Sequence, residues 1–228
     1  MAARAHHAAG EAAEAGEAAR RSLGLEITAE GLHLLGVSQR MLGDDAGSQE
    51  SYRSAIGLAP ESPDLRIGLA LTLVSPLGDA DPAPADSPER IAEARERCGE
   101  AATLAPDHAA VPYTRGIVEM AADDLPGAAR HLERALELDP ELAAAHRVLG
   151  TVRARQGMGR LASRHLAAAG RLEPGNPQAL SLLRRLVRPM TRRARRRGDA
   201  DTSRVVPAAA HIIETDLGFR ESPPTEWS

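Results

Sequence analysis

The feature that most constrains this chain is a step of 34 residues that recurs along it. The step separates four pairs of identical residues, namely Gly116 and Gly150, Ala128 and Ala162, Ala135 and Ala169, and Pro140 and Pro174. Agreement of four pairs at one period predicts a repeated helix-turn-helix unit. Such units stack to bury their apolar faces and leave a concave surface, so the pattern predicts a protein that binds proteins or peptides.

Two further copies precede these. One runs from Ala29 to Ser62, and the next contains Gly68. The distance from Gly68 to Gly116 is 48 residues, 14 more than the period, so we expect an insertion near residues 75–88, where the sequence is acidic and rich in proline. The Ser87-Pro88 pair that follows is typical of a helix N-cap and first turn.

The small and large residues of the copies occur at fixed offsets. In the copy from Ala143 to Asn176, Leu149 and Gly150 fall on the first helix and Ala162 and Leu166 on the second. This pattern resembles the tetratricopeptide repeat family over about residues 29–188. The resemblance implies an all-α fold, a right-handed helix-turn-helix solenoid of four repeats with N-terminal and C-terminal capping helices.

We therefore expect three regions. Residues 1–28 contain an N-terminal helix, Ala3–Leu23, that is either a cap or part of a degenerate repeat. Residues 29–190 form the solenoid, which ends in a capping helix at Pro177–Arg188. Residues 191–228 form an Arg-rich segment and a tail.

In the family that the chain resembles, the first helix of each repeat lines the concave groove. The equivalent positions here are His33, Val37, Arg40, Met41, Leu65, Leu69, Thr72, Leu73, Tyr113, Ile117, Met120, Arg147, Thr151 and Arg155. An apolar centre with Arg at both ends suits a peptide with apolar anchors and at least one acidic group. The alternative is that Leu65, Leu69 and Ile117 belong to the core between repeats.

Some family members bind a C-terminal carboxylate through Lys and Asn on these helices. This chain has no Lys and only one Asn, Asn176, so we do not expect that clamp. No phosphate-binding loop, nucleophile elbow, metalloprotease helix or paired-Cys motif occurs, and the Asp pairs at 44–45 and 123–124 fit helix caps. We expect no catalysis, no cofactor and no small-molecule substrate.

Three histidines need separate consideration. His131 and His165 are 34 residues apart, and His146 lies between them in the sequence. A metal site would need a third ligand that converges with them, so we predict none.

The Arg-rich segment offers a second hypothesis. Residues 184–197 hold eight Arg and no acid, including Arg192, Arg193, Arg195, Arg196 and Arg197. Such a cluster could tether the chain to nucleic acid or to an anionic membrane surface, although no aromatic residue interleaves with it to stack bases. Beyond it, an apolar motif that contains Ile212, Ile213, Leu217 and Phe219 could fold back onto the groove.

The compartment can also be predicted. The chain has no uncharged apolar run of about 18 residues, and Met1–Gly16 lacks the apolar core of a signal peptide. Its single cysteine, Cys98, fits a reducing environment. We expect a cytoplasmic protein.

Overall fold

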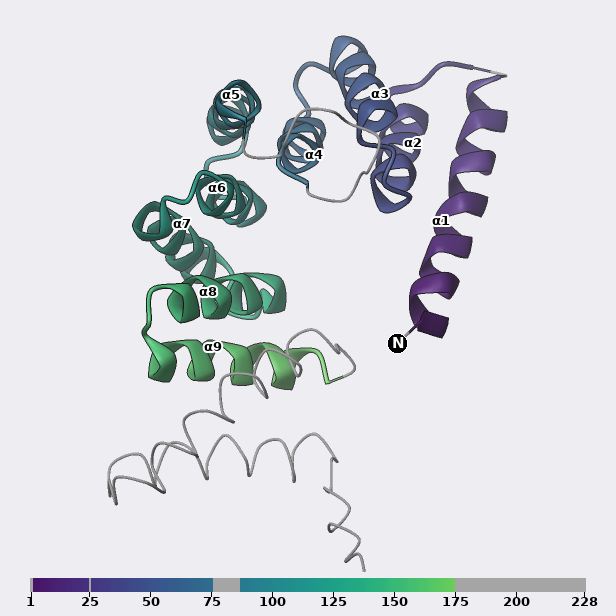
Figure 1. Ribbon diagram of the computed structural model, residues 1–228. Coiled ribbons are helices and arrows are strands. Elements are labelled where there is room, and N and C mark those ends of the chain that lie inside the picture. The colour runs from purple at the N-terminus through teal and green to yellow at the C-terminus, as the bar shows by residue number, and fades with distance from the viewer. Residues whose placement is uncertain (1, 25, 76–86, 175–228) are drawn as a thin grey trace, which may run out of the picture. The chain divides into compact units, whose positions relative to one another are not determined.

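The computed structural model describes residues 2–24, 26–75 and 87–174, and the regular structure in these ranges is helical. The helices of the described residues are α1 (Ala2–Leu23), α2 (Ala29–Met41), α3 (Asp45–Leu58), α4 (Pro63–Leu73), α5 (Pro88–Leu104), α6 (Ala110–Ala121), α7 (Leu125–Leu138), α8 (Ala143–Arg155) and α9 (Gly159–Leu172) (Figure 1). The chain divides into two compact units, Met1–Arg134 and Ala135–Ser228, with the boundary inside α7.

The helices pack in pairs, as the 34-residue period predicts. In the first unit, α2 packs on α3 and α4 packs on α5, and the first helices of successive repeats, α2, α4 and α6, also contact one another in that order (Figure 1). In the second unit, α8 packs on α9. The prediction of an all-α fold built from helix-turn-helix repeats is confirmed.

Close approach of two helices explains the repeated glycines. A Cβ atom on Gly116 of α6 would lie 2.6 Å from Leu132 Cγ, and one on Gly150 of α8 would lie 2.7 Å from Leu166 Cγ. In both places the leucine of the second helix occupies the space that a side chain would need. The same contact therefore recurs at the same step as the sequence pattern.

Capping and turn residues set the helix ends. The side chains of Thr28, Asp44 and Ser87 accept hydrogen bonds from the backbone N–H groups of Gly31, Gly47 and Arg90 at 3.1, 2.9 and 3.3 Å. Asp124 accepts in the same way from Gly127 N at 2.9 Å. The predictions of caps at the two Asp pairs and at Ser87 are confirmed.

The turn after a first helix requires a left-handed residue. This residue is Gly43 after α2 (φ 81°) and Gly157 after α8 (φ 77°), each seven positions beyond the packing glycine of its repeat. Asp123 holds the equivalent position after α6 with φ 59°. Glycine adopts this backbone without steric cost, and Asp is among the few other residues that tolerate it.

α1 packs along α2 through small residues. Ser38 Oγ of α2 donates a hydrogen bond to the Ala12 carbonyl of α1 at 2.5 Å, and Gly16 of α1 faces the same serine. At the end of α1, Leu23 reaches Gly31 of α2. Because Ala12, Gly16 and Leu23 follow a helical spacing, one face of α1 covers one face of α2.

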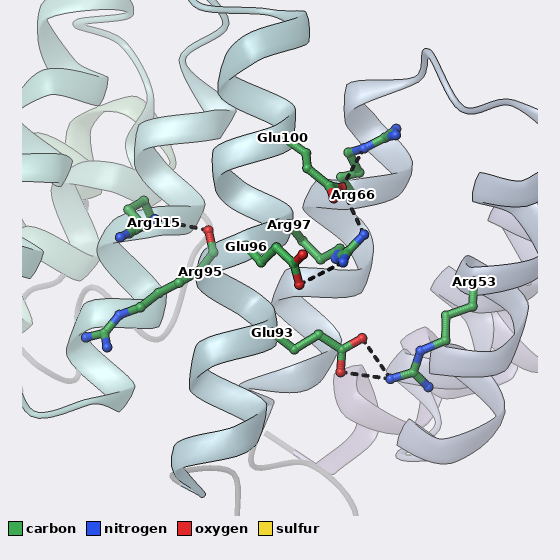
Figure 2. Close-up of polar contacts among 8 residues, drawn as sticks. All are labelled: Arg53, Arg66, Glu93, Arg95, Glu96, Arg97, Glu100 and Arg115. Atoms are coloured by element: carbon green, nitrogen blue, oxygen red, sulfur yellow. Dashed lines mark hydrogen bonds and ion pairs between the residues drawn. The ribbon is translucent and has the colours of Figure 1, made fainter.

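Ion pairs join neighbouring helices of the first unit (Figure 2). Arg53 of α3 donates to both Glu93 carboxylate oxygens of α5 at 3.0 Å. Arg66 of α4 pairs with Glu100 of α5 at 2.9 Å, and Arg97 of α5 shares that carboxylate at the same distance. These side chains are partly exposed, so each pair contributes roughly 0–1 kcal/mol.

A core cluster of the first unit includes Tyr52, Leu69, Leu73 and Cys98, whose thiol is buried. Several predictions concern residues outside the described ranges. These are the interior of the insertion at residues 76–86, the capping helix at 177–188, the Arg cluster from Arg192 to Arg197, and the tail.

Candidate functional site

Tyr52 of α3 lies where the first two repeats meet. Its ring is buried between two glycines: a Cβ on Gly36 of α2 would lie 3.0 Å from Tyr52 Cε2, and a Cβ on Gly68 of α4 would overlap Cε1 on the other edge. One aromatic side chain therefore fixes the positions of α2, α3 and α4 relative to one another.

Arg40 of α2 lies beside this tyrosine. Burial raises the pKa of the Tyr52 phenol above its ordinary value, and the charge and hydrogen bond of Arg40 partly oppose the rise. The Arg40 Nε atom is buried, and no described residue accepts a hydrogen bond from it. No carboxylate of the described residues forms an ion pair with Arg40, whereas Arg53, Arg66, Arg95, Arg97 and Arg115 all have one.

His33 and Val37 occupy the preceding turns on the same side of α2. The His33 ring meets the edge of Tyr52 with the ring centroids 5.7 Å apart and the planes at 69°. Val37 is partly buried and packs against the core cluster. Three residues of the predicted groove therefore gather around the tyrosine.

Two apolar side chains continue this surface toward α1. Leu34 is 52% exposed and Met41 is 50% exposed. Ser38, which holds α1, lies between them on the helix. We call the set His33, Leu34, Val37, Arg40 and Met41 the α2 strip.

The centre of the predicted groove is not on the surface. The four positions on α4, Leu65, Leu69, Thr72 and Leu73, are all buried, with exposed fractions of 2% or less. The alternative interpretation, in which Leu65 and Leu69 belong to the core, agrees with this burial. Thr72 Oγ1 lies 3.1 Å from the buried Ser48 hydroxyl and donates to the Gly68 carbonyl at 2.9 Å, so it has a structural role.

The positions on α6 are intermediate. Tyr113, Ile117 and Met120 are partly exposed, and Ile117 also packs against the core cluster. Because α4 contacts both α2 and α6, the α6 residues belong to the same unit as the α2 strip.

The remaining groove positions lie in the second unit, on α8. Arg147 and Thr151 are partly exposed and Arg155 is exposed. Thr151 Oγ1 donates to the Arg147 carbonyl at 3.1 Å, one turn back along the helix.

The second unit also brings two histidines together. His146 Nδ1 of α8 lies 3.1 Å from His165 Nδ1 of α9, and His146 Nε2 lies 3.1 Å from the Pro140 carbonyl. A carbonyl only accepts, so the contact with Pro140 places a proton on His146 Nε2. The sequence pattern paired His165 with His131, whereas the contact is with His146.

In residues 2–24, 26–75 and 87–174, no three His, Cys, Asp or Glu side chains are grouped so as to hold a metal ion. Within the same ranges, no helix has the length and apolar character needed to cross a membrane.

Sequence reasoning missed two features of this surface. Leu34 is absent from the family's groove positions, although it precedes Met41 by seven residues and so shares its face. The missing partner of Arg40 could not be anticipated, because the chain is rich in acids and only the fold decides which of them reach a given Arg.

Comparisons with known proteins address the fold. No protein-family model matches this sequence, and no curated protein matches it. Solved structures do match. TTC0263, a thermophilic TPR protein in Thermus thermophilus, aligns with a TM-score of 0.71 and 19% identity over 79% of this chain and 93% of its own. Pseudomonas aeruginosa pilF aligns with a TM-score of 0.59 and 16% identity over 85% of this chain and 78% of its own. A chain of the APC/C hetero-tetramer Cut9-Hcn1 aligns with a TM-score of 0.55 and 20% identity over 70% of this chain and 30% of its own.

Proposed function

Because this chain has the fold of the tetratricopeptide repeat proteins, we propose that it is a non-enzymatic, cytoplasmic scaffold that binds a segment of another protein on the surface formed by its first helices. The proposed solenoid spans residues 29–190. The observation that carries the proposal is the α2 strip, where two half-exposed apolar side chains lie beside an arginine that has no acidic partner among the described residues.

The apolar part of the strip supports the use of apolar anchors. Leu34 and Met41 each expose about half of their surface, and burying such a side chain yields roughly 1.5–3 kcal/mol when it is complete. Methionine also adapts its shape to different partners. A leucine-sized or aromatic side chain of the partner would fit against this pair.

Arg40 supports recognition of a carboxylate. Its guanidinium lies beside Tyr52 and forms no ion pair with a carboxylate of the described residues, so an incoming carboxylate would supply the opposite charge. Hydrogen bonds to charged groups contribute about 1.5–3 kcal/mol. We propose that Tyr113, Ile117 and Met120 on α6, in the same unit, extend the contact. Arg147, Thr151 and Arg155 on α8 are proposed as contacts of the second unit by itself.

A protein of similar fold provides a precedent for binding another protein. One chain with this fold is part of the Cut9-Hcn1 hetero-tetramer, an assembly of different proteins. The α2 strip differs from the groove prediction in two respects. It includes Leu34, and it is confined to the first repeat, next to α1, because the α4 positions are buried.

The test uses the full chain as bait for partners from its native host. Met41→Glu places a carboxylate on the apolar edge of the strip and is expected to reduce partner recovery at least about tenfold, as loss of one well-packed anchor would. The matched control is Leu58→Glu on α3, which alters a side chain of similar exposure (53%) outside the strip.

Three outcomes separate the hypotheses. Loss of the partner with Met41→Glu and its retention with Leu58→Glu supports the strip. Equal recovery with both variants argues against it. The competing function, an electrostatic tether to nucleic acid or anionic membrane through residues 184–197, predicts loss only when Arg192, Arg193, Arg195, Arg196 and Arg197 are replaced by Ser.

A further inference from the structure

The second unit contains a pair of helices without acidic residues. Between Glu141 and Glu173, a stretch of 31 residues holds six Arg and no Asp or Glu. This stretch includes all of α8 and α9, so the charged side chains of both helices are basic. A surface with one sign of charge attracts a partner of the opposite sign.

Three of these arginines form a row along α9. Arg160, Arg164 and Arg171 are all exposed. With 3.6 residues per turn, they fall within about 40° of one another around the helix axis and extend over about 16 Å along it. In the described part of the chain, no carboxylate forms an ion pair with Arg164 or Arg171. We call these three residues the α9 arginine row.

An apolar row runs beside the arginine row. Leu161 and Leu172 are each 38% exposed, and Ala168 between them is partly exposed. These three residues lie about 80° around the helix axis from the arginine row. On the opposite side of α9, Leu166 is buried against Gly150 of α8. Both rows therefore lie on the side of α9 that faces away from this contact.

The two rows together indicate the class of partner. Nucleic acid presents phosphates, but its backbone offers no apolar surface to the leucines. An acidic protein segment would need carboxylates in register with the arginine steps of four and seven residues. A bilayer that contains anionic lipids presents headgroups without a fixed register, and a hydrocarbon boundary lies just below them. Basic and large apolar side chains side by side are typical of helices that bind at this interface.

We propose that the exposed side of α9 binds the surface of an anionic lipid bilayer, with the arginine row at the lipid headgroups and Leu161 and Leu172 at the boundary with the acyl chains. This lipid site goes beyond the proposed function, which uses the α2 strip of the first unit, and it does not involve residues 184–197. Because only three arginines contribute, the binding is reversible, and it brings a protein-binding scaffold to a membrane surface.

The first test is co-sedimentation of the full chain with vesicles. Phosphatidylcholine vesicles with about 30% phosphatidylserine should bind the chain at least about tenfold more strongly than phosphatidylcholine alone. Each arginine near such a surface strengthens binding about fivefold, so Arg164→Gln with Arg171→Gln should weaken it about 25-fold. The matched control, Arg20→Gln with Arg21→Gln, removes the same charge from exposed positions on α1 and should change binding less than about twofold.

The second test reports which side of the unit meets the lipid. Leu161→Cys is labelled with a nitrobenzoxadiazole dye, whose fluorescence rises in apolar surroundings, and the buried Cys98 does not compete for the label. Vesicles with phosphatidylserine should raise this fluorescence at least about twofold. The same label at Leu58→Cys, on α3 and 53% exposed, should not respond. Circular dichroism of each variant establishes that the helices are intact.

The contrary outcomes are equally clear. Equal binding to both kinds of vesicle, undiminished binding after Arg164→Gln with Arg171→Gln, or an unresponsive dye at position 161 overturns the proposal. Loss of vesicle binding only in the variant with Ser at the five arginine positions of the Arg-rich segment also overturns it. If duplex DNA binds through Arg164 and Arg171 and the vesicles do not bind, the ligand is nucleic acid and the lipid assignment is wrong.

The lipid site and the proposed function can fail separately. Met41→Glu lies in the α2 strip and should leave vesicle binding unchanged, whereas it should lower recovery of the protein partner. If vesicles do not bind while Met41→Glu still loses the partner, the lipid site is wrong and the proposed function stands.

Discussion

Gly116 is a position where one methyl group decides whether two helices can meet. A Cβ there would lie 2.6 Å from Leu132 Cγ and 3.2 Å from the Ala128 carbonyl oxygen, and Leu132 is itself fully buried. Gly116→Ala should therefore force α6 and α7 apart and lower the free energy of unfolding by about 1–3 kcal/mol, measured by urea denaturation.

The control is a glycine on an exposed part of a helix. Gly99 lies on α5, and a Cβ at this position would meet nothing within 4 Å. Gly99→Ala should raise stability by about 0.5–1 kcal/mol, because alanine loses less backbone entropy in a helix. If both variants shift stability in the same direction, the close approach at Gly116 is not what that glycine provides.

Cys98 should be chemically inert while the protein is folded. Burial raises the pKa of its thiol to about 12, with the charge of Arg115 opposing this only in part. At pH 8 the thiolate fraction is then about 10⁻⁴, roughly a thousandfold below that of an exposed cysteine. Labelling by a disulfide reagent should be slow in buffer and fast in denaturant. Rapid labelling in buffer would show that the first unit opens near α5.

At the scale of elements, Glu119 couples α5 to α6. It is buried, and it accepts hydrogen bonds from Arg95 Nε of α5 at 3.2 Å and from Arg115 Nε of α6 at 2.7 Å. Arg115 also donates to the Arg95 carbonyl at 3.1 Å (Figure 2). Burial alone would raise the pKa of the Glu119 carboxyl, but the two arginines outweigh it and hold the pKa below its ordinary 4.5.

The pH dependence follows from this direction. A carboxyl whose pKa is lower in the folded state stabilises the fold above its unfolded pKa, and this contribution disappears as the pH falls through the folded value. Stability should therefore fall as the pH drops below about 4.5. Glu119→Gln should cost about 1–3 kcal/mol at pH 7 and reduce the slope of stability against pH below about 4.5, measured by thermal melts from about pH 3 to 7. An unchanged slope would assign the acid sensitivity to other carboxylates.

The elements themselves could be predicted because their signals are local. Ser87 and Pro88 begin α5, and Asp44 and Asp124 cap their helices, as expected from short-range backbone chemistry. Exposure was harder to predict, because it depends on neighbours that the repeat pattern does not specify. Leu65 and Leu69 occupy groove positions by their place in the repeat, yet they lie in the core.

At the scale of the whole molecule, the 34-residue period predicted the fold because each repeat reproduces one glycine-to-leucine contact, at Gly116 and again at Gly150. The candidate site depends on differences between repeats. Tyr52 takes the leucine's place in the first repeat, and an arginine lies beside it without an acid among the described residues. Such exceptions depend on individual side chains of one repeat, and a pattern that all repeats share does not describe them.

The salt response of partner binding belongs to the molecule as a whole, because it distinguishes the repeats from the Arg-rich segment. If five arginines of that segment neutralised five phosphates, raising the salt from about 50 to 200 mM would weaken binding by roughly 500-fold. A contact through Leu34, Met41 and the single charge of Arg40 should weaken by less than about tenfold over the same range, because apolar burial is not screened by salt. Titration of the purified partner against the full chain at both salt concentrations measures the ratio. If the strip binds the partner, the variant with Ser at the five arginine positions should leave the ratio of affinities at the two salt concentrations unchanged. If the Arg-rich segment binds it, the same variant should lose the steep dependence of affinity on salt.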